Sequence, residues 1–330
     1  MLHNMNRQAF VEAFQRQLSS KFNVGYQSWW HKFLFHYSDI SNIISVLNSG
    51  KLYSRNKAVE LGLMQNDNAD DDVIGNTGLN AKEYVRFYFG ALTPTQYHNE
   101  GFKAKNTIQH NAHCPVPVFL LFDFVKLLSR EDSRFSSGNM ASNRVDIYDD
   151  AEALNALEFE YIYHRGSTHQ ESNPRHITYC RHAEGLIPNE LNIYDYLKYV
   201  CVRSEAEKQT LLHHLDTNVK QKLAQKIRIH TNGLFYADRF YIETVRLIDD
   251  VFSITFSKAT SDKFDFVFKI TNNDTEHSYK KEALQVSLES KTVTFKIKAE
   301  YVSANLSLQI KIDGSLAYEH NFGKDMDYVI

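Results

Sequence analysis

The periodicity of the hydrophobic residues changes near residue 237, and this change requires two different architectures along one chain. Beyond that point apolar and polar residues alternate in short runs, separated by turn residues such as Asn272-Asn273-Asp274. A period of two is typical of half-buried antiparallel strands. The sequence therefore predicts a small all-β, sandwich-like domain over residues 238–330, with strands at 251–256, 264–270, 284–288, 293–297 and 306–312.

Residues 33–237 mix helical and strand patterns, which predicts an α+β domain. Ile40, Ile43, Ile44 and Leu47 have the spacing of one buried helix face, and Gly50 is suited to end that helix. Residues 1–32 are predicted to form an N-terminal helical extension. A capping box, Ser204 with Glu207, predicts one helix from residue 204 to about residue 226. Strands are expected at 33–35, 84–89 and 116–124.

Composition limits the possible environments of the chain. Three scattered cysteines, Cys114, Cys180 and Cys201, form neither a disulfide framework nor a CxxC zinc pair, so a reducing cytoplasm is expected. The N-terminus has no secretory signal pattern, and apolar runs stay well short of the roughly 20 residues that span a membrane. We therefore expect a cytoplasmic protein with no membrane partner.

Charge is balanced before residue 237, with 25 basic and 25 acidic residues, and the remainder carries a net charge of −3. Such a chain does not coat nucleic acid, but a local cationic groove would serve a short single-stranded segment. The segment 165–228, with ten basic and seven acidic residues, is one candidate. A solvated surface of mixed charge explains it equally well.

Three short segments carry side chains suited to chemistry. In the first, His36 and Ser38 end a strand and Asn42 follows, so the histidine and the serine are able to hold ribose hydroxyls or an amide. Alternatively, His36 is partly buried and Ser38 or Ser41 caps the next helix. In the second, Tyr84 and Tyr88 belong to an aromatic strand that forms either a stacking wall or core.

The third segment is Arg181-His182-Ala183-Glu184, which precedes an apolar run. A carboxylate at such a position is unusual unless it faces a cleft. The alternative is a surface glutamate paired with Arg181.

The order of these three segments resembles the DarT family of ADP-ribosyltransferases over residues 33–237. That family has a strand-borne histidine and Ser/Thr, an asparagine at the same offset, a helix ending in Gly-Lys-Leu, an aromatic strand, and a catalytic Ala-Glu before an apolar strand. The matching positions here are His36, Ser38, Asn42, Gly50-Lys51-Leu52, Tyr84 to Phe89, and Ala183-Glu184.

The resemblance implies a split, mixed β-sheet that binds NAD as a substrate, with no metal. Glu184 would be the catalytic carboxylate, His36 and Ser38 would hold NAD with Asn42, Tyr84 and Tyr88 beside them, and residues 166–181 would recognise the target. The family's catalytic arginine corresponds to Arg55, which lies early in the chain, or to Arg86, which replaces a proline of the aromatic strand.

The resemblance further implies a toxin that modifies a base of single-stranded DNA, with RNA as the second choice, and that a protein antitoxin restrains. NAD hydrolysis and a degenerate, non-catalytic binding module are the alternative functions. The acidic residues Asp67 to Asp72 fail the EF-hand pattern for calcium and are expected in a solvated loop. The β-rich tail is expected either to dock a protein or to cover a sheet edge.

Overall fold

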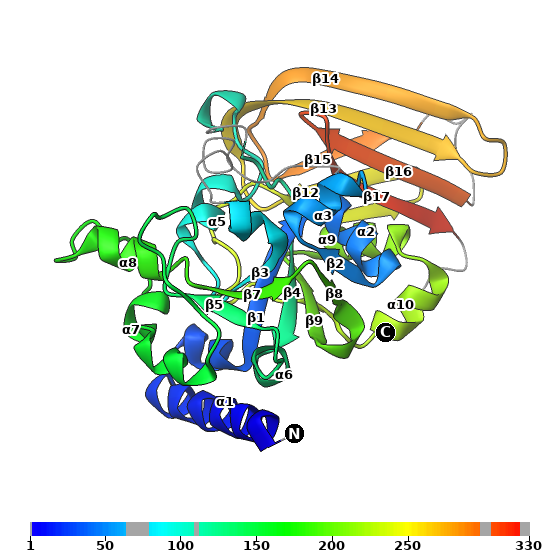
Figure 1. The fold of residues 1–330 in the computed structure, drawn as a ribbon. Helices are drawn as coiled ribbons and strands as arrows, with labels where there is room; N and C mark the ends of the chain where they lie inside the picture. The colour runs from blue at the N-terminus through cyan, green and yellow to red at the C-terminus, as the bar shows by residue number, and fades with distance from the viewer. Residues whose placement is uncertain (1, 64–78, 109–111, 298–304, 324–330) are drawn as a thin grey trace.

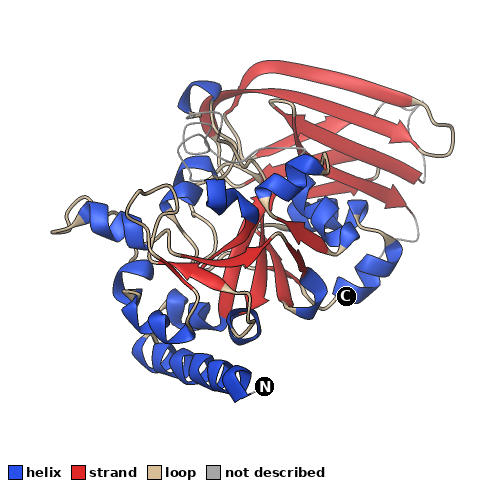
Figure 2. Ribbon diagram, viewed as in Figure 1, coloured by secondary structure: helices blue, strands red, loops and turns tan. Residues whose placement is uncertain are grey.

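The computed structural model describes residues 2–63, 79–108, 112–297 and 305–323 (Figure 1). The acidic segment Asp67 to Asp72, whose sequence fails the EF-hand pattern, lies outside these residues. The described part has a mixed α/β body followed by antiparallel sheets, which confirms the predicted fold class (Figure 2). Among the described helices, none combines the length and apolar content that a membrane crossing requires.

The described residues of the first part build an eight-stranded sheet at its centre. Nearly all neighbouring strands are antiparallel, but β9 and β10 are parallel, so the sheet is mixed. The strands across it are β10 (Ile227–Ile229), β9 (Leu197–Val202), β4 (Pro117–Asp123), β1 (Phe33–Asp39), β3 (Tyr84–Tyr88), β7 (Glu184–Pro188), β5 (Arg134–Ser136) and β6 (Ile147–Tyr148).

The sheet opens between its two middle strands. Strand β1 pairs with β4 along its full length, whereas its register with β3 consists of the single pair Phe35↔Tyr88. The predicted strand at 33–35 was too short, because pairing with β4 carries β1 on to Asp39. His36 and Ser38 consequently lie within a strand, beside the opening, and not in a closing turn.

The helix after β1 follows the sequence prediction closely. Helix α2 (Ile40–Ser49) buries Ile40, Ile43 and Leu47, and Gly50 ends it in the left-handed region with φ 71°. Asp39 caps its first turn by accepting from the backbone N–H of Ser41. The Ser38 capping alternative is therefore wrong.

Shorter helices surround the central sheet. They are α3 (Arg55–Glu60), α5 (Pro94–Asn99), α6 (Phe124–Leu128), α7 (Phe159–Ile162) and α8 (Pro174–Cys180), with 3-10 turns at Tyr26–Lys32, Leu79–Glu83, Lys105–Thr107, Ala151–Ala156 and Ile193–Asp195. The N-terminal helix α1 (Leu2–Lys21) buries Val11, Phe14 and Leu18 against this body. A separate pair of strands, β2 (Lys51–Tyr53) and β8 (Glu190–Asn192), joins the regions after α2 and β7.

The helix predicted over 204–226 is in fact two helices, α9 (Glu205–His214) and α10 (Thr217–Leu223). Leu215 is extended with ψ 143°, which interrupts the helix. The backbone N–H of Asp216 donates to Asn48 Oδ1 instead of continuing the helical ladder. The capping role of Ser204 at the start of α9 is confirmed.

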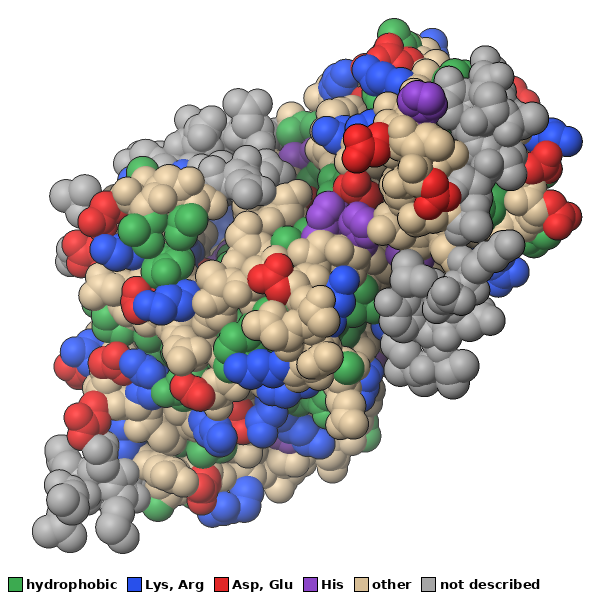
Figure 3. All heavy atoms as spheres, turned by 90° about the vertical axis from the view of Figure 1, so that its right-hand side faces the viewer, with side chains coloured by type: hydrophobic (Ala, Val, Ile, Leu, Met, Phe, Trp, Pro, Cys, Tyr) green, Lys and Arg blue, Asp and Glu red, His purple; other side chains and the backbone are tan. Residues whose placement is uncertain are grey.

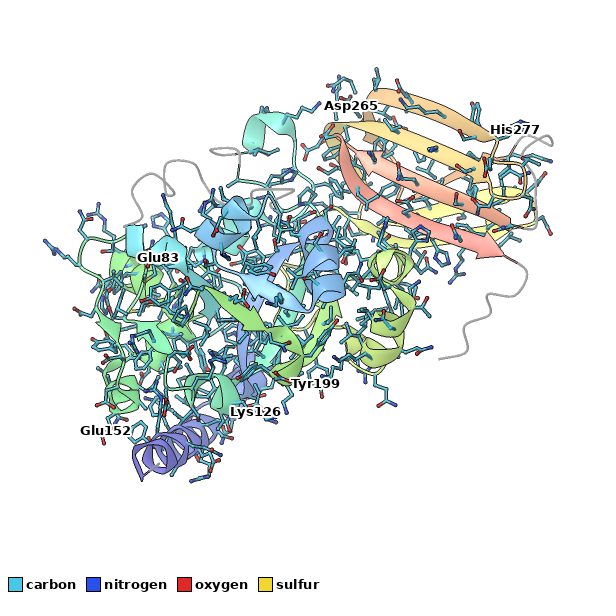
Figure 4. All side chains as sticks on the ribbon, turned by 45° about the vertical axis from the view of Figure 1, so that its right-hand side comes forward. Glu83, Lys126, Glu152, Tyr199, Asp265 and His277 are labelled. Carbon is cyan, nitrogen blue, oxygen red and sulfur yellow. The ribbon has the colours of Figure 1, made fainter. Side chains whose placement is uncertain are left out.

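The described residues of the C-terminal part form two antiparallel sheets. One has the order β11 (Ile242–Ile248), β12 (Val251–Phe256), β15 (Thr292–Lys296), and the other has β14 (Ser278–Leu288), β13 (Thr260–Asn272), β16 (Asn305–Ile312), β17 (Ser315–Gly323). All five predicted strands are present, whereas β11 and β17 were not predicted. Asp265 and His277 lie toward opposite ends of the larger sheet (Figure 4).

Helix α9 joins the two parts. Ser204 Oγ donates to the carbonyl of Ile242, Tyr318 Oη donates to Gln209 Oε1, and the N–H of Glu319 donates to Thr210 Oγ1, at 2.7–3.1 Å. Ala206 and Leu211 are fully buried, and one continuous hydrophobic core runs through both parts. The two antiparallel sheets of β11 to β17, here called the antiparallel module, therefore cover an apolar face of the first part.

Candidate active site

A buried ion pair joins two neighbouring strands next to the opening of the sheet. Glu184 lies opposite Tyr88 in the register of β3 and β7, and Arg86 is two residues away on the same face. Arg86 Nε donates to Glu184 Oε2 at 2.5 Å and its second nitrogen donates to Oε1 at 2.8 Å. The Glu184 side chain is 1% exposed and that of Arg86 is 37% exposed, so the pair reaches solvent on the arginine side.

Glu184 is fixed through its backbone as well. Its N–H donates to Ser136 Oγ on β5 at 3.0 Å, and Ser136 Oγ donates to the carbonyl of Gly138. An unpaired carboxylate at this depth would cost several kcal/mol of desolvation, which the two charge-assisted hydrogen bonds offset. Arg181, the partner expected if Glu184 were a surface residue, donates to the carbonyls of Leu92 and Gly166 instead.

The Glu184 carboxylate raises the pKa values of Arg86 and Tyr88. Burial alone would lower the pKa of Arg86, but the charge and hydrogen bonds of Glu184 outweigh burial and raise it. Burial, with the nearby charge of Glu184, raises the pKa of the Tyr88 hydroxyl. Arg86 is thus a permanent cation and Tyr88 a neutral hydrogen-bonding group at neutral pH.

His36 lies on the other side of the sheet opening. Its Nδ1 donates to the carbonyl of Arg86 at 3.1 Å, because a carbonyl oxygen only accepts. Burial lowers the pKa of His36, so the ring is neutral near pH 7 and its Nε2 is an acceptor. A neutral imidazole acceptor next to the opening suits a ribose hydroxyl or a carboxamide N–H.

Ser38 and Asn42, which the sequence also predicted as site residues, contact each other. Asn42 Nδ2, on α2, donates to Ser38 Oγ at 3.1 Å, which orients the hydroxyl at the end of β1. The spacing of four residues across the strand–helix junction allows this contact. His36 and Ser38, two residues apart on β1, and Asn42 therefore form one polar edge, and its role in binding NAD stays a prediction.

The aromatic strand has one fully buried face and one half-buried face. Phe87 and Phe89 are fully buried in the core. Tyr88 is half-buried on the Arg86 face, stacked on Tyr37 at 6.2 Å between ring centroids and edge-on to His182 at 6.4 Å. Tyr84, also on this face, packs against Met140 and Leu186. The phenylalanines therefore belong to the core, and the stacking role of the two tyrosines stays a prediction.

His182 is a site residue for which the sequence suggested no role. Its Nδ1 donates to the carbonyl of Thr178 and its Nε2 accepts from the Thr95 hydroxyl, at 2.8 and 2.9 Å. Burial lowers its pKa to about 4, so it is neutral and its tautomer is fixed by the carbonyl. Thr95 lies 87 residues earlier, and no local pattern reveals such a contact.

Arg55 begins α3, outside the Arg86–Glu184 pair. The preceding residue, Ser54, caps this helix and donates its N–H to the carbonyl of Asn189 at 2.7 Å. Asn189 follows the last residue of β7, whereas Glu184 is the first residue of that strand. Because a strand rises about 3.3 Å per residue, Arg55 lies toward the opposite end of β7 from Glu184. The catalytic role of Arg55 stays a prediction.

The basic residues of the segment 165–228, which were expected to form one cationic groove, lie in different places. Arg203 is buried in an ion pair with Glu207. Lys198, Lys222 and Lys226 line a pocket of about 430 Å³ together with Tyr199, and their mutual repulsion adds to burial in lowering the pKa of Lys226. Tyr199 and Lys126 are labelled toward the lower edge of the body in Figure 4, and Figure 3 shows basic side chains gathered on one face. This lysine pocket lies on β9 and α10, across β4, β1 and β3 from Glu184.

The split mixed sheet, the buried Glu184 and the polar edge at His36 are the features that the sequence resemblance implied for an ADP-ribosyltransferase. The family described as "ssDNA thymidine ADP-ribosyltransferase, DarT" matches residues 35–236. The chain belongs to this family, which confirms the predicted class of enzyme. The antiparallel module lies outside the matched residues.

Solved structures with a similar fold include three of DarT from Thermus sp. 2.9. The complex with ADP-ribosylated ssDNA has a TM-score of 0.49 and 14% identity, and the match covers 62% of this chain and 96% of that chain. The complex with NAD+ has a TM-score of 0.45 and 15% identity, and the match covers 60% of this chain and 96% of that chain. The complex with carba-NAD+ has a TM-score of 0.45 and 16% identity, and the match covers 60% of this chain and 92% of that chain. A comparison with curated proteins gives no match.

Proposed function

We propose that this chain transfers ADP-ribose from NAD to the thymine base of single-stranded DNA, with Glu184 as the catalytic carboxylate. The observation that carries the assignment is the buried Glu184, held from two sides by Arg86 and Ser136 next to the opening of the sheet. Family membership supplies the reaction class, and the burial and hydrogen bonds of Glu184 support the choice of residue.

The reaction breaks the bond between C1′ of the nicotinamide ribose and the nicotinamide nitrogen, which keeps the bonding electrons. A nucleophilic atom of the base then forms a bond to C1′ and releases a proton. A carboxylate facing C1′ stabilises the positive charge of the oxocarbenium-like transition state and is able to accept that proton. Glu184 is suited to this because its position is fixed before substrate arrives.

Side chains on both sides of the sheet opening would hold NAD. We assign the His36 Nε2 acceptor and the Ser38–Asn42 pair to ribose hydroxyls or the carboxamide, and Tyr88 to stacking or hydrogen bonding with the nicotinamide end. Tyr84 extends that wall. Arg86 is partly exposed and cationic, so it is able to keep one hydrogen bond to Glu184 while facing a pyrophosphate.

Single-stranded DNA is the acceptor that the family name specifies, and an unpaired base reaches the site without the cost of unstacking a duplex. RNA remains the second choice. We further propose that the protein is a cytoplasmic toxin of a toxin–antitoxin or phage-defence system, restrained by a protein antitoxin. The antiparallel module is the surface that we assign to that partner, and residues 166–181 are assigned to target recognition.

The test is incubation of the purified chain with NAD and matched oligonucleotides, followed by mass spectrometry. Thymidine-containing single-stranded DNA is expected to gain one ADP-ribose, while an oligonucleotide without thymidine is not. Release of free ADP-ribose without modified DNA would establish NAD hydrolysis instead. An unchanged NAD pool with every substrate would favour a degenerate binding module, and labelled RNA alone would change the acceptor.

A further inference from the structure

Three side chains of different types converge between α7 and α8, outside the transfer site. Glu158 occupies the position before the first turn of α7, and His176 and Cys180 are four residues apart on α8. Residues at this spacing share one helix face, so the imidazole and the thiol both turn toward α7. The Glu158 side chain, which does not cap its own helix, completes the group.

The polar atoms of these side chains lie close enough together to reach one metal ion after small shifts. His176 Nε2 lies 2.7 Å from Glu158 Oε1, Cys180 Sγ lies 3.6 Å from His176 Nε2, and Cys180 Sγ lies 3.9 Å from Glu158 Oε1. Ligand atoms on a tetrahedral zinc ion, with bonds of roughly 2.0–2.3 Å, lie about 3.3–3.6 Å from one another. Shifts of about half an ångström would bring all three atoms to those positions.

The chemistry of the set favours zinc over harder cations. A thiolate and an imidazole select borderline-soft metals, whereas magnesium and calcium prefer oxygen ligands. One thiolate and one carboxylate neutralise a divalent ion, and the Cys180 thiol releases its proton to solvent on binding. Cys180 is buried, while the His176 and Glu158 side chains are 35% and 50% exposed, so an ion would enter from solvent and keep a water as its fourth ligand.

We propose that Glu158, His176 and Cys180 form a zinc site that clamps α8 to α7. Helix α8 forms the end of the segment 166–181 and leads directly into Arg181, His182 and Glu184. Zinc bound here would hold the helix from which the carbonyl of Thr178 anchors His182. The site is structural and does not depend on which base the protein modifies.

The experiment uses the full chain, first stripped with a chelator and then titrated with zinc chloride by calorimetry, with metal content measured after dialysis. We expect one zinc per chain. Cys180→Ser and His176→Ala should each weaken binding by at least about 100-fold, and Glu158→Gln by about tenfold. His169→Ala, an exposed histidine of the same segment, is the matched control and should bind as the wild type does.

Cobalt binding gives a readout that reports the thiolate itself. The wild-type chain and His169→Ala should show sulfur-to-cobalt charge-transfer absorption, and Cys180→Ser should lack it. Zinc binding that persists in Cys180→Ser would overturn the proposal, as would a wild-type chain that retains no zinc. A second group, His213, His214 and Glu319, also has ligand atoms close together. Loss of zinc in His214→Ala, with binding intact in Cys180→Ser, would place the ion there and refute the α8 site.

Discussion

Arg86 and Glu184 contact each other diagonally across two antiparallel strands, with Nε 2.5 Å from Oε2. The register places Tyr88, and not Arg86, directly opposite Glu184. The arginine therefore reaches along the sheet face to the carboxylate. This one contact accounts for both the burial of the carboxylate and the presence of an arginine in the aromatic strand.

Glu184→Gln is expected to reduce ADP-ribose transfer by about a hundredfold or more, because the amide keeps the shape of the side chain and loses the negative charge. Steady-state assays on single-stranded DNA would measure the loss. Glu190→Gln is the matched control, since Glu190 lies on β8 in an exposed ion pair with Lys51 and should retain full activity. Near-normal transfer by Glu184→Gln would refute the site assignment.

Arg86→Gln is expected to lower both transfer and stability, because it leaves Glu184 buried with fewer hydrogen bonds. We expect a loss on the order of 1–3 kcal/mol in unfolding free energy, since the arginine is partly exposed. The double variant with Glu184→Gln should recover part of that loss, and a double-mutant cycle measures the coupling. Additive effects on stability would contradict the pairing.

Arg55→Gln separates the two candidates for the family arginine. If Arg55 contacts NAD, the variant should lower transfer by about tenfold or more with an unchanged melting temperature. Full transfer by Arg55→Gln, with a large loss in Arg86→Gln, would assign the role to Arg86.

His36→Ala is expected to weaken NAD binding as well as turnover, because the neutral Nε2 acceptor is lost. Calorimetric titration with a non-hydrolysable NAD analogue measures the affinity directly. Unchanged affinity would return His36 to a purely structural role, holding β1 to β3 through the carbonyl of Arg86.

Glu100 should make stability depend on pH. It is fully buried, bonded to Gln96 and to the N–H of Tyr236, and burial raises its pKa to about 7. A raised carboxyl pKa means that the folded chain binds the proton more tightly than the unfolded chain does. The stabilisation is present below about pH 4.5 and is lost as pH rises through about 7, a change on the order of 3 kcal/mol.

Comparison with Glu100→Gln isolates this effect from other titrating groups. The difference in unfolding free energy, wild type minus variant, should become less favourable to the wild type between pH 5 and pH 8. Denaturant melts at several pH values provide the measurement. Parallel pH profiles would show that Glu100 keeps an ordinary pKa in the folded chain.

Removal of residues 238–330 tests the division of labour between the two parts. We expect the shortened chain to transfer ADP-ribose and to escape its partner, since Glu184 and His36 lie outside the module. It should also melt at a lower temperature, because α9 loses its contacts with Ile242, Tyr318 and Glu319. A shortened chain that is folded by circular dichroism but inactive would show that the module belongs to the active enzyme.

Local patterns in the sequence predicted the elements that local chemistry controls. Helix α2 with its Gly50 end, the Ser204 cap and the alternating strands after residue 250 depend on residues within a few positions of one another. The same patterns failed where residues distant in the sequence form hydrogen bonds with the backbone. Asn48 takes the N–H of Asp216 and so ends α9, and β4 extends β1 beyond Phe35.

By itself, the sequence determined the succession of an α+β part and a β-rich part, through periodicity, and the family, through the order of three short motifs. The same motifs predicted Glu184 and His36 as site residues. Only the tertiary structure decided that Arg86 pairs with Glu184, that Thr95 fixes His182, and that Glu158 meets His176 and Cys180. These contacts join residues 18 to 98 positions apart, and strand register and helix packing, not local sequence, bring such side chains within hydrogen-bonding distance.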